Sequence, residues 1–375
     1  MNFHIFQNEP KFIGDFIKIS NNIDAVRQTY IAVNPSDDLP WIKENEGVVK
    51  VKSLRELAEY LRINASENDK VFFHSLTDEI IVLVANEQFP GKKYWIVWGW
   101  ELYENISLNS IPKYDFVQSW PKSKLVNTLY YYKSLSGLNK GKKQIFKKFL
   151  SQISGILHYS KYDIELINTE YGTNVPMVPF FYKNVIDLKQ LNSLQQENRN
   201  SEILSIILGN SATASNNHFS AMRELSSLKE MKFNLYLPLS YGPKEYARRV
   251  ETYAQQKLFG KHVVISEFMG SLEYLKLLNS MDVAIMNQIR SQAMGNIIVL
   301  LVLGKTIYMN KKCTSSLLLK EIGIKFRFTD ELRNLTSFKH LSEEEKSENK
   351  KRIMSFFDDE VQKNNLENIY SEESK

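Results

Sequence analysis

The second half of the chain alternates between short apolar runs and segments with apolar residues at helical spacing. The apolar runs recur about every 20 to 30 residues, which is the spacing of strand-plus-helix units. We expect five strands, at 203–208, 233–237, 262–265, 282–286 and 306–309. Helices are expected at 219–225, 243–258, 271–280 and 295–303. Runs that are apolar throughout are typical of a parallel sheet covered by helices on both faces.

The first half shows the same pattern less regularly. Strands are expected at 3–6, 29–33, 71–73, 94–97 and 155–159, and a helix over 53–63. A polar stretch, DLKQLNSLQQENR at 187–199, has no sustained apolar face and is the candidate linker. The charged tail predicts one or two closing helices. We therefore predict an α/β protein with a first domain at 1–186, a linker at 187–200, a second domain at 201–338 and closing helices at 339–375.

Length and composition indicate the number of domains and the cellular compartment. A chain of 375 residues is long for a single core and favours two domains. No run approaches the roughly 18 to 20 apolar residues of a membrane span, and no secretion signal is visible at the N-terminus. The single cysteine, Cys313, excludes an internal disulfide and fits a reducing compartment. We expect a cytoplasmic protein.

Several common kinds of site are missing from the sequence. There is no GxxxxGK[ST] phosphate loop, no GxGxxG after a strand and no GxSxG nucleophile motif. No DxD motif of metal-dependent sugar transferases occurs, and six scattered histidines with one cysteine give no zinc spacing. We expect no bound metal.

Two loops that follow strands of the second half are candidate anion sites. The first, LGNSATASNNH at 208–218, is rich in small residues, which let backbone N–H groups approach a phosphate at a helix N-terminus. It can equally be a capped turn, because Ser215 and Asn216 are good N-caps. The second, NQIRSQAMGN at 287–296, offers Arg290 as a phosphate partner, and its alternative is a solvated loop. In a parallel sheet both loops lie at the carboxyl ends of strands, where ligands bind.

In the first half, candidate chemistry gathers near two strand ends. His74 ends one strand, and three tryptophans with Glu101 surround Gly99 in the stretch YWIVWGWELY at 94–103. Aromatic faces are common platforms for sugars, although buried aromatic residues are more often core. A glutamate beside such a cluster can have a raised pKa and act as a base, or be an ordinary exposed side chain.

The stretch at 119–162 holds nine lysines and no acidic residue, interleaved with aromatic residues. Such a run is usually a solvated face. The mixture of basic and aromatic residues also suits an anionic membrane surface. It would suit nucleic acid too, but no nucleic-acid-binding fold accompanies it, so we expect no nucleic-acid partner.

Several of these segments together resemble one enzyme family. They resemble the bacterial TDP-N-acetylfucosamine:lipid II N-acetylfucosaminyltransferases, the 4-alpha-L-fucosyltransferases of glycosyltransferase family 56, which act in enterobacterial common antigen synthesis. The matching segments run in family order along most of the chain: FFH at 72–74, WIVWGWELY at 95–103, ILGNS at 207–211, SNNH at 215–218, YGP at 241–243, LEYLKLLNSMD at 272–282 and QAMGN at 292–296. The chain departs from the family at Trp100, at Glu101 and at Ala212–Ala214, which leaves the transferred and acceptor sugars open.

The resemblance implies a GT-B fold, in which two Rossmann-like domains face each other across a cleft. It implies a nucleotide-sugar donor on the C-terminal domain and a lipid-linked glycan acceptor on the N-terminal one. We expect a metal-independent glycosyltransferase, peripheral on the inner face of the cell membrane, that moves an N-acetylfucosamine-like deoxyamino sugar from a dTDP donor. The acceptor is then a polyprenyl-diphosphate-linked glycan, and no cofactor is expected, because the dTDP-sugar is a substrate.

The matching segments, together with the two candidate anion loops, give the expected site residues. The donor diphosphate is expected at Gly209, Asn210 and Ser211, and the charge on the leaving diphosphate is offset by Arg290, Gln292 and the helix N-terminus at Gly295 and Asn296. Further donor-side residues are Asn216, His218 and Tyr241. Glu101 is the first choice for the general base and His74 the second. The expected acceptor-side residues are Trp98, Trp100 and Tyr103.

Two other functions remain open at this stage. A non-catalytic module that binds a nucleotide sugar would keep the donor loops and need no base. A GT-B transferase that acts on a soluble or surface oligosaccharide with another nucleotide sugar would make the lysine-rich stretch incidental.

Overall fold

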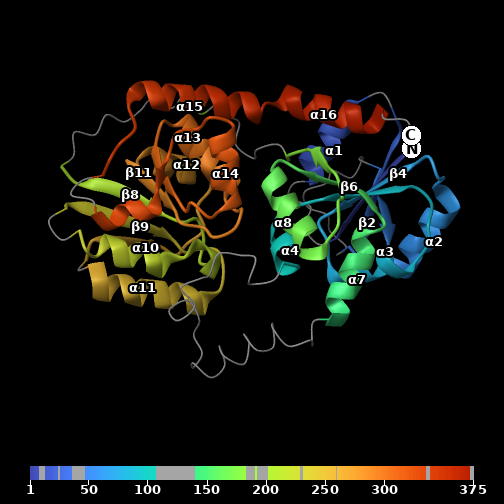
Figure 1. Cartoon of the computed structure of the whole chain (residues 1–375), viewed down its shortest axis with the longest axis horizontal. Coiled ribbons are helices and arrows are strands. Elements are labelled where there is room, and N and C mark those ends of the chain that lie inside the picture. Colours follow the sequence, from blue (N-terminus) through green and yellow to red (C-terminus); the bar gives the residue numbers. More distant parts are fainter. Residues whose placement is uncertain are drawn as a thin grey trace. The chain divides into compact units, whose positions relative to one another are not determined.

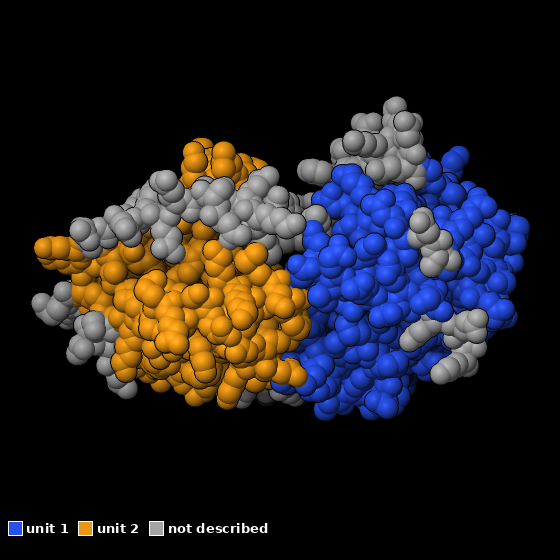
Figure 2. All heavy atoms as spheres, turned by 90° about the horizontal axis from the view of Figure 1, so that it is seen from above, with its two compact units in different colours: residues 1–110, 136–183, 357–375 blue, residues 111–135, 184–356 orange. Residues whose placement is uncertain are grey.

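A computed structural model describes residues 1–7, 13–23, 26–35, 47–106, 140–182, 191, 202–228, 231–258, 260–334 and 338–371. These residues divide into two compact units, drawn in blue and orange in Figure 2. Unit 1 contains those before residue 183 and those from 357 onward, and unit 2 contains those from 191 to 356. The predicted linker at 187–200 lies outside the described residues except for Leu191.

Unit 1 is built on a seven-stranded sheet in the order β3-β2-β1-β4-β5-β6-β7 (Figure 1). Its strands are β1 (Asn2–Gln7), β2 (Gln28–Val33), β3 (Val49–Val51), β4 (Lys70–His74), β5 (Lys92–Ile96), β6 (Ile153–His158) and β7 (Met177–Pro179). All neighbouring pairs run parallel. The central strands are buried on both faces, which explains their apolar runs, although β1, β4 and β5 also bury polar residues such as His4, Lys70 and Lys93.

Helices cover both faces of this sheet. They are α1 (Ile13–Asn21), α2 (Leu54–Asn64), α3 (Asp78–Asn86), α4 (Trp100–Glu104), α7 (Lys140–Leu150), α8 (Lys161–Tyr171) and α16 (Asp359–Ser371). On one face, α1 and α16 share a core cluster with strand residues such as Phe72. On the other face, Trp95 packs edge-on against Phe146 and Phe149 of α7.

The last helix returns to unit 1. The buried Lys70 Nζ donates to the carbonyls of Ile369 and Tyr370 at 2.7 and 3.1 Å, where α16 ends. Gln362 Nε2 donates to the carbonyl of Phe181. The predicted closing segment is therefore shared, because α15 (Glu343–Phe356) belongs to unit 2 and α16 to unit 1.

Unit 2 is built on a six-stranded parallel sheet in the order β10-β9-β8-β11-β12-β13. Its strands are β8 (Leu204–Leu208), β9 (Phe233–Pro238), β10 (His262–Ile265), β11 (Val283–Met286), β12 (Thr306–Met309) and β13 (Arg327–Phe328). Counted from the first strand of the unit, this is the 3-2-1-4-5-6 order of a Rossmann fold. The predicted α/β class is confirmed in both units.

The helices of unit 2 follow its strands, and its two candidate loops lie between strand and helix. The helices are α10 (His218–Leu225), α11 (Lys244–Leu258), α12 (Ser271–Asn279), α13 (Met294–Val302), α14 (Thr314–Glu321) and α15, with short 3-10 turns η2 (Ala214–Asn216) and η3 (Thr329–Asn334). α10 and α11 pack in one core cluster over the sheet. The chain leaves β8 toward β9 and leaves β11 toward β12, so a crevice opens where these neighbouring strands end.

Candidate functional site

The two loops predicted from the sequence lie together at this switch point of unit 2. Ile289 N donates to the Ser215 carbonyl at 3.2 Å, and Asn287 Nδ2 donates to the Asn217 carbonyl at 3.2 Å. Gln292 of the second loop also hydrogen-bonds to two residues of the first loop. Its Oε1 accepts from Ser215 Oγ, and its Nε2 donates to Asn210 Oδ1 at 3.4 Å. The loop after β8 and the loop after β11 are therefore joined by one network of largely buried polar contacts.

Gly209 begins the first loop with a backbone that only glycine adopts easily. Its φ is +68°, and a Cβ there would lie 2.8 Å from Asn216 Oδ1 and 3.1 Å from His218 Nε2. The Gly209 N–H donates to the Ile285 carbonyl at 3.0 Å. Because this amide continues the sheet pairing, a bound diphosphate would draw its donors from Asn210 and Ser211 instead.

The side chain of Asn216 hydrogen-bonds to residues earlier in the same loop. It is fully buried, and its Nδ2 lies 2.9 Å from the Ser211 carbonyl, 3.1 Å from Ser211 Oγ and 3.0 Å from Thr213 Oγ1. Gln288 Nε2 donates to its Oδ1 at 3.4 Å. Asn216 thus fixes the loop that carries Ser211, so its effect on a donor would be to shape that loop.

His218 has a buried ring nitrogen without a hydrogen-bond partner among the described residues. It is fully buried, and Nδ1 lies 3.1 Å from the Tyr246 hydroxyl. Nε2 has no hydrogen-bond partner among the described residues. Burial lowers the pKa of His218 to about 3, so the ring is neutral. An unsatisfied buried polar atom costs about 1–3 kcal/mol, and such atoms call for an explanation such as a ligand.

The second loop leads into the apolar helix α13. Ala293 caps it with φ +58°, and Gly295 lies exposed in the first turn, where backbone N–H groups can face an anion. Arg290 is half-buried in the same loop. Asn296 Nδ2 donates to Tyr274 Oη at 2.8 Å, which ties its amide to α12. Arg290 and Gly295 are therefore the better placed of these residues for a diphosphate.

A third loop, after β9, packs directly on the first. Ala212 N donates to the Tyr241 carbonyl at 2.6 Å, and a Cβ on Gly242 would lie 2.6 Å from the Ala212 carbonyl oxygen. This contact explains the YGP segment, because no side chain fits at Gly242. It also holds Tyr241 at the edge of the site, where 74% of the residue is exposed.

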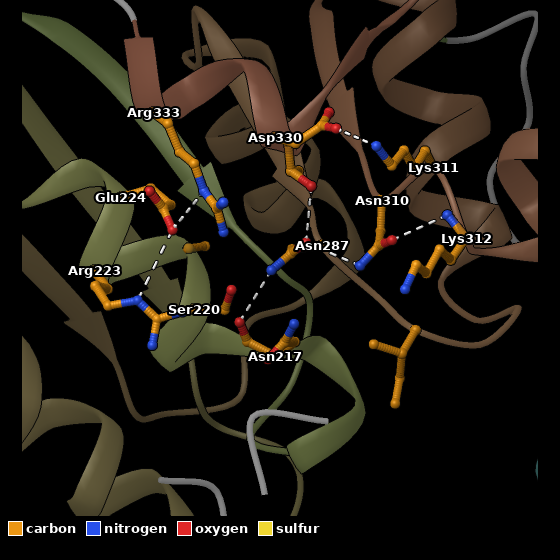
Figure 3. Close-up of a pocket in the computed structure, with 13 residues that line it drawn as sticks. Asn217, Ser220, Arg223, Glu224, Asn287, Asn310, Lys311, Lys312, Asp330 and Arg333 are labelled. Atoms are coloured by element: carbon orange, nitrogen blue, oxygen red, sulfur yellow. Dashed lines mark hydrogen bonds and ion pairs between the residues drawn. The ribbon is translucent and has the colours of Figure 1, made fainter. Parts of the chain in front are cut away.

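A polar pocket of about 270 Å³ adjoins these loops (Figure 3). α10, the loops after β11 and β12, and η3 contribute four basic and two acidic side chains to its wall. Lys311 pairs with Asp330, and Arg333 Nε lies 3.2 Å from a Glu224 oxygen. The lining residues are Asn217, Ser220, Ala221, Arg223, Glu224, Asn287, Ile289, Asn310, Lys311, Lys312, Thr329, Asp330 and Arg333. Sequence reasoning missed the NKK segment at 310–312, although it follows a predicted strand in the same way as the two loops.

In unit 1, Glu101 lies in the first turn of α4, at the carboxyl end of β5. It is only 1% exposed, and its Oε1 accepts from the Trp98 backbone N–H at 2.6 Å. Oε2 makes no hydrogen bond of standard geometry among the described residues, although the Trp95 indole lies near the carboxyl. Burial raises the pKa of Glu101 to about 7, against the lowering effects of the Trp98 amide, its own amide, the Trp95 indole and His158. A carboxyl with this pKa changes charge near neutral pH, as a general base requires.

His74, the second candidate base, is buried at the end of β4. Its Nε2 lies 3.0 Å from His4 Nδ1, and its Nδ1 lies 2.6 Å from the Tyr182 hydroxyl. Burial, followed by the field of His4, holds the pKa of His74 well below its usual range. Both ring nitrogens are therefore engaged inside unit 1, which makes Glu101 the better placed of the two.

The three expected acceptor-side aromatic residues differ in exposure. Trp100 is 42% exposed and Trp98 is half-buried. Tyr103 is buried, and its hydroxyl donates to Asp163 Oδ1. His158, at the end of β6, shares this carboxylate through a 2.8 Å contact from Nε2 to Asp163 Oδ2. Ring surface for a sugar is therefore found on Trp98 and Trp100.

The basic stretch at 119–162 is described only from residue 140 onward. In α7, the aromatic residues Phe146 and Phe149 lie in the core, so they do not form an outer surface. Lys142 pairs with Asp78, and Lys143 pairs with Glu170. None of the described helices is long and apolar enough to span a bilayer. Within the same described ranges, no three His, Cys, Asp or Glu side chains are grouped to hold a metal ion.

The family follows from a comparison with known proteins. Residues 154–372 match a family model described as "4-alpha-L-fucosyltransferase glycosyl transferase group 56". The chain belongs to this family. The expected resemblance is confirmed, and the protein is a glycosyltransferase.

Solved structures with the same architecture support the fold. A glycosyltransferase from Rickettsia africae ESF-5 is 12% identical, with a TM-score of 0.62 over 98% of this chain and 97% of that one. The N-terminal domain of Candida albicans trehalose-6-phosphate phosphatase is 9% identical, with a TM-score of 0.62 over 98% and 95%. An E. coli protein described as "Trehalose-6-phosphate" and bound with UDP-2-fluoro glucose is 10% identical, with a TM-score of 0.57 over 99% and 98%. The predicted GT-B class, with two Rossmann-like units, is confirmed.

Proposed function

We propose that this glycosyltransferase moves an N-acetylfucosamine-like deoxyamino sugar from a dTDP donor to a polyprenyl-diphosphate-linked glycan. The observation that carries the donor part is the buried Nε2 of His218, which lies beside Gly209 at the switch point of unit 2 without a partner among the described residues. With Tyr246 O–H donating to Nδ1, Nε2 carries the proton and can donate to a phosphate oxygen.

The donor diphosphate would lie between the loop at 209–211 and the N-terminus of α13. Asn210 and Ser211 supply side-chain donors, and Arg290 and the amide of Gly295 face the same anion. As the bond from the anomeric carbon to the diphosphate breaks, its electron pair passes to the diphosphate oxygen. Arg290 and the positive end of α13 offset that charge, so transfer needs no divalent ion.

Glu101 is the proposed base. The acceptor hydroxyl oxygen forms the new bond to the anomeric carbon, and its proton passes to Glu101 Oε2. Support comes from the position of Glu101 after a strand end, the lack of a hydrogen bond of standard geometry at its Oε2 among the described residues, and its raised pKa. The bond from Trp98 N–H to Oε1 would also suit a purely structural carboxylate, and replacement of Glu101 separates the two roles.

The acceptor would lie on unit 1, with sugar rings against Trp98 and Trp100. The family resemblance favours a polyprenyl-diphosphate carrier at the inner face of the cell membrane. Exposed lysines of α7, such as Lys140 and Lys147, would then contact anionic headgroups.

A transfer assay with two acceptors tests this function. Purified protein is incubated with a dTDP-deoxyamino sugar and either a polyprenyl-diphosphate-linked disaccharide or the same disaccharide without lipid. We expect product only in the organic extract of the lipid-linked reaction. Transfer to the lipid-free disaccharide at an equal rate would contradict the lipid-linked acceptor and support a transferase of soluble oligosaccharides.

A further inference from the structure

A chain of buried hydrogen bonds crosses the sheet of unit 1 and ends at Trp98. Gln28 Oε1 lies 3.0 Å from His4 Nε2, and His4 Nδ1 lies 3.0 Å from His74 Nε2. His74 Nδ1 lies 2.6 Å from the Tyr182 hydroxyl, which accepts from Trp98 Nε1 at 2.8 Å. Three adjacent strands (β2, β1 and β4), the segment after β7 and the segment after β5 thus contribute one residue each.

The direction of every bond in this chain can be derived. Gln28 Nε2 donates to the Val26 carbonyl at 2.8 Å, so Gln28 Oε1 is an acceptor and His4 Nε2 carries a proton. Burial lowers the pKa of His4 to about 3 and that of His74 well below 6.5, so each ring has a single proton. His4 Nδ1 therefore accepts from His74 Nε2–H, and His74 Nδ1 accepts from Tyr182 O–H.

This series of hydrogen bonds orients the side chains that form it and does not conduct protons. An amide cannot take up a proton and pass it on, so Gln28 ends the series. Its effect is on the other end, where the Tyr182 oxygen holds the indole of Trp98. The ring of Tyr182 is itself held edge-on by Phe16 and Phe180, with ring centroids 6.2 and 5.0 Å away. Tyr182 therefore has a fixed position from which to hold Trp98.

Trp98 donates two hydrogen bonds, one from its side chain and one from its backbone. Its indole N–H donates to Tyr182, and its backbone N–H donates to Glu101 Oε1. The rings of Trp98 and Tyr182 are perpendicular, at 90° and 6.0 Å. A half-buried indole whose N–H and whose own backbone are both hydrogen-bonded has a restricted orientation, and a fixed aromatic face binds a sugar ring at lower entropic cost.

We propose that Tyr182 is a positioning residue that fixes the Trp98 indole as a stacking surface for a sugar ring of the acceptor. This inference rests on the proposed function, in which the acceptor lies on unit 1. It assigns a role to the two buried histidines as well. They set the direction of the Tyr182 hydroxyl, so that its oxygen lone pair faces Trp98.

Tyr182→Phe tests the inference, because it keeps the ring and removes the oxygen to which Trp98 donates. The matched control is Tyr370→Phe. That hydroxyl bonds to Ser20 Oγ at 2.8 Å and lies 3.3 Å from His4 Nε2, at the far end of the same chain. We expect Tyr182→Phe to raise the KM for the acceptor about three- to tenfold, the equivalent of one hydrogen bond, with kcat and donor affinity little changed. Tyr370→Phe should leave the acceptor KM unchanged.

Nuclear magnetic resonance supplies a readout that does not depend on the acceptor. The indole N–H resonance of Trp98, assigned with Trp98→Phe, should shift in Tyr182→Phe and stay in place in Tyr370→Phe. An unshifted resonance, or an equal rise of acceptor KM in both variants, would overturn the inference. If the wild type transfers to no lipid-linked acceptor, the proposed function fails, while the indole resonance still decides the role of Tyr182.

Discussion

His218 Nε2 lies 3.1 Å from the point where a Cβ on Gly209 would sit, and Asn216 Oδ1 lies 2.8 Å from the same point. Asn216 and the unsatisfied ring nitrogen of His218 therefore pack directly against Gly209 and leave no room for a Cβ. We predict that Gly209→Ala weakens dTDP binding at least about tenfold, because the methyl group would displace Asn216 and His218 and a φ of +68° strains alanine by roughly 1–2 kcal/mol. Calorimetric titration with dTDP measures the effect.

Gly270→Ala is the matched control for this experiment. Gly270 is the N-cap residue of α12, and no atom lies within 4 Å of its potential Cβ. Its dTDP affinity should equal that of the wild type. Normal dTDP affinity in a folded Gly209→Ala protein would mean that the loop is only a turn.

Most of the strands and both candidate loops of unit 2 were predicted from the sequence. The five strands predicted for the second half lie within one residue of β8 to β12, since each contains an apolar run, which is largely buried in β8, β11 and β12 and partly exposed in the edge strand β10. β3, β7 and β13 were missed because these short strands have only two or three residues each and lack a long apolar run. The pairing of the loops at 209–217 and 287–293 followed from the rule that parallel strands end at one edge.

Contacts between distant parts of the sequence explain why the structural environment of His74 was not predicted, but that of the α7 aromatic residues has a local explanation. His74 looked like a candidate base, but its partners His4 and Tyr182 come from 70 residues before it and 108 residues after it. The aromatic residues of α7 looked like a membrane surface, but their spacing places Phe146 and Phe149 on the core side of an amphipathic helix. The contacts of His74 have no local signal in the sequence, whereas the helical spacing of Phe146 and Phe149 is a local signal that favours the core.

Glu101→Gln should lower kcat by about 100- to 10,000-fold and leave dTDP affinity unchanged, because glutamine keeps the shape but takes no proton. The wild-type rate should rise with pH up to about 7, the pKa of Glu101, and this rise should vanish in the variant. Steady-state kinetics across pH measures both. A fully active Glu101→Gln enzyme would place the base elsewhere, with His74 next to be replaced.

The same carboxyl should also change the pH dependence of stability. Its pKa is raised from 4.5 to about 7 on folding, so between these values the folded protein keeps a proton that the unfolded chain has lost. The free energy of unfolding of the wild type should therefore fall, relative to Glu101→Gln, as pH rises from 4.5 to 7, and level off above. Urea titrations at several pH values test this, and a constant difference would show that burial does not shift this pKa.

Treatment with EDTA should leave transfer activity intact. Arg290 and the N-terminus of α13 are proposed to offset the charge of the leaving diphosphate, so no divalent ion is required. The assay compares product formed before and after dialysis against the chelator. Complete loss of activity that magnesium or manganese restores would contradict this part of the account.

The protein should bind anionic vesicles through α7. Lys140 and Lys147 are exposed, and each basic residue near such a surface contributes about 1 kcal/mol. Replacing both with glutamine should weaken sedimentation with anionic vesicles by roughly ten- to thirtyfold. The control replaces Lys276 and Lys363, on α12 and α16, and should bind as the wild type does. Equal pelleting with neutral and anionic lipid, or no sensitivity to salt, would mean that the lysines form only a solvated face.

The central claim is that the switch point of unit 2 holds a dTDP donor, and a thermal-shift panel of dTDP, UDP, GDP and CMP tests it most directly. A ligand at 100 times its dissociation constant adds about 2.7 kcal/mol to the stability of the state that binds it. We predict that dTDP raises the unfolding temperature clearly more than the other three nucleotides, and that Gly209→Ala abolishes this difference. Equal shifts with all four nucleotides, or the largest shift with one other than dTDP, would contradict the account.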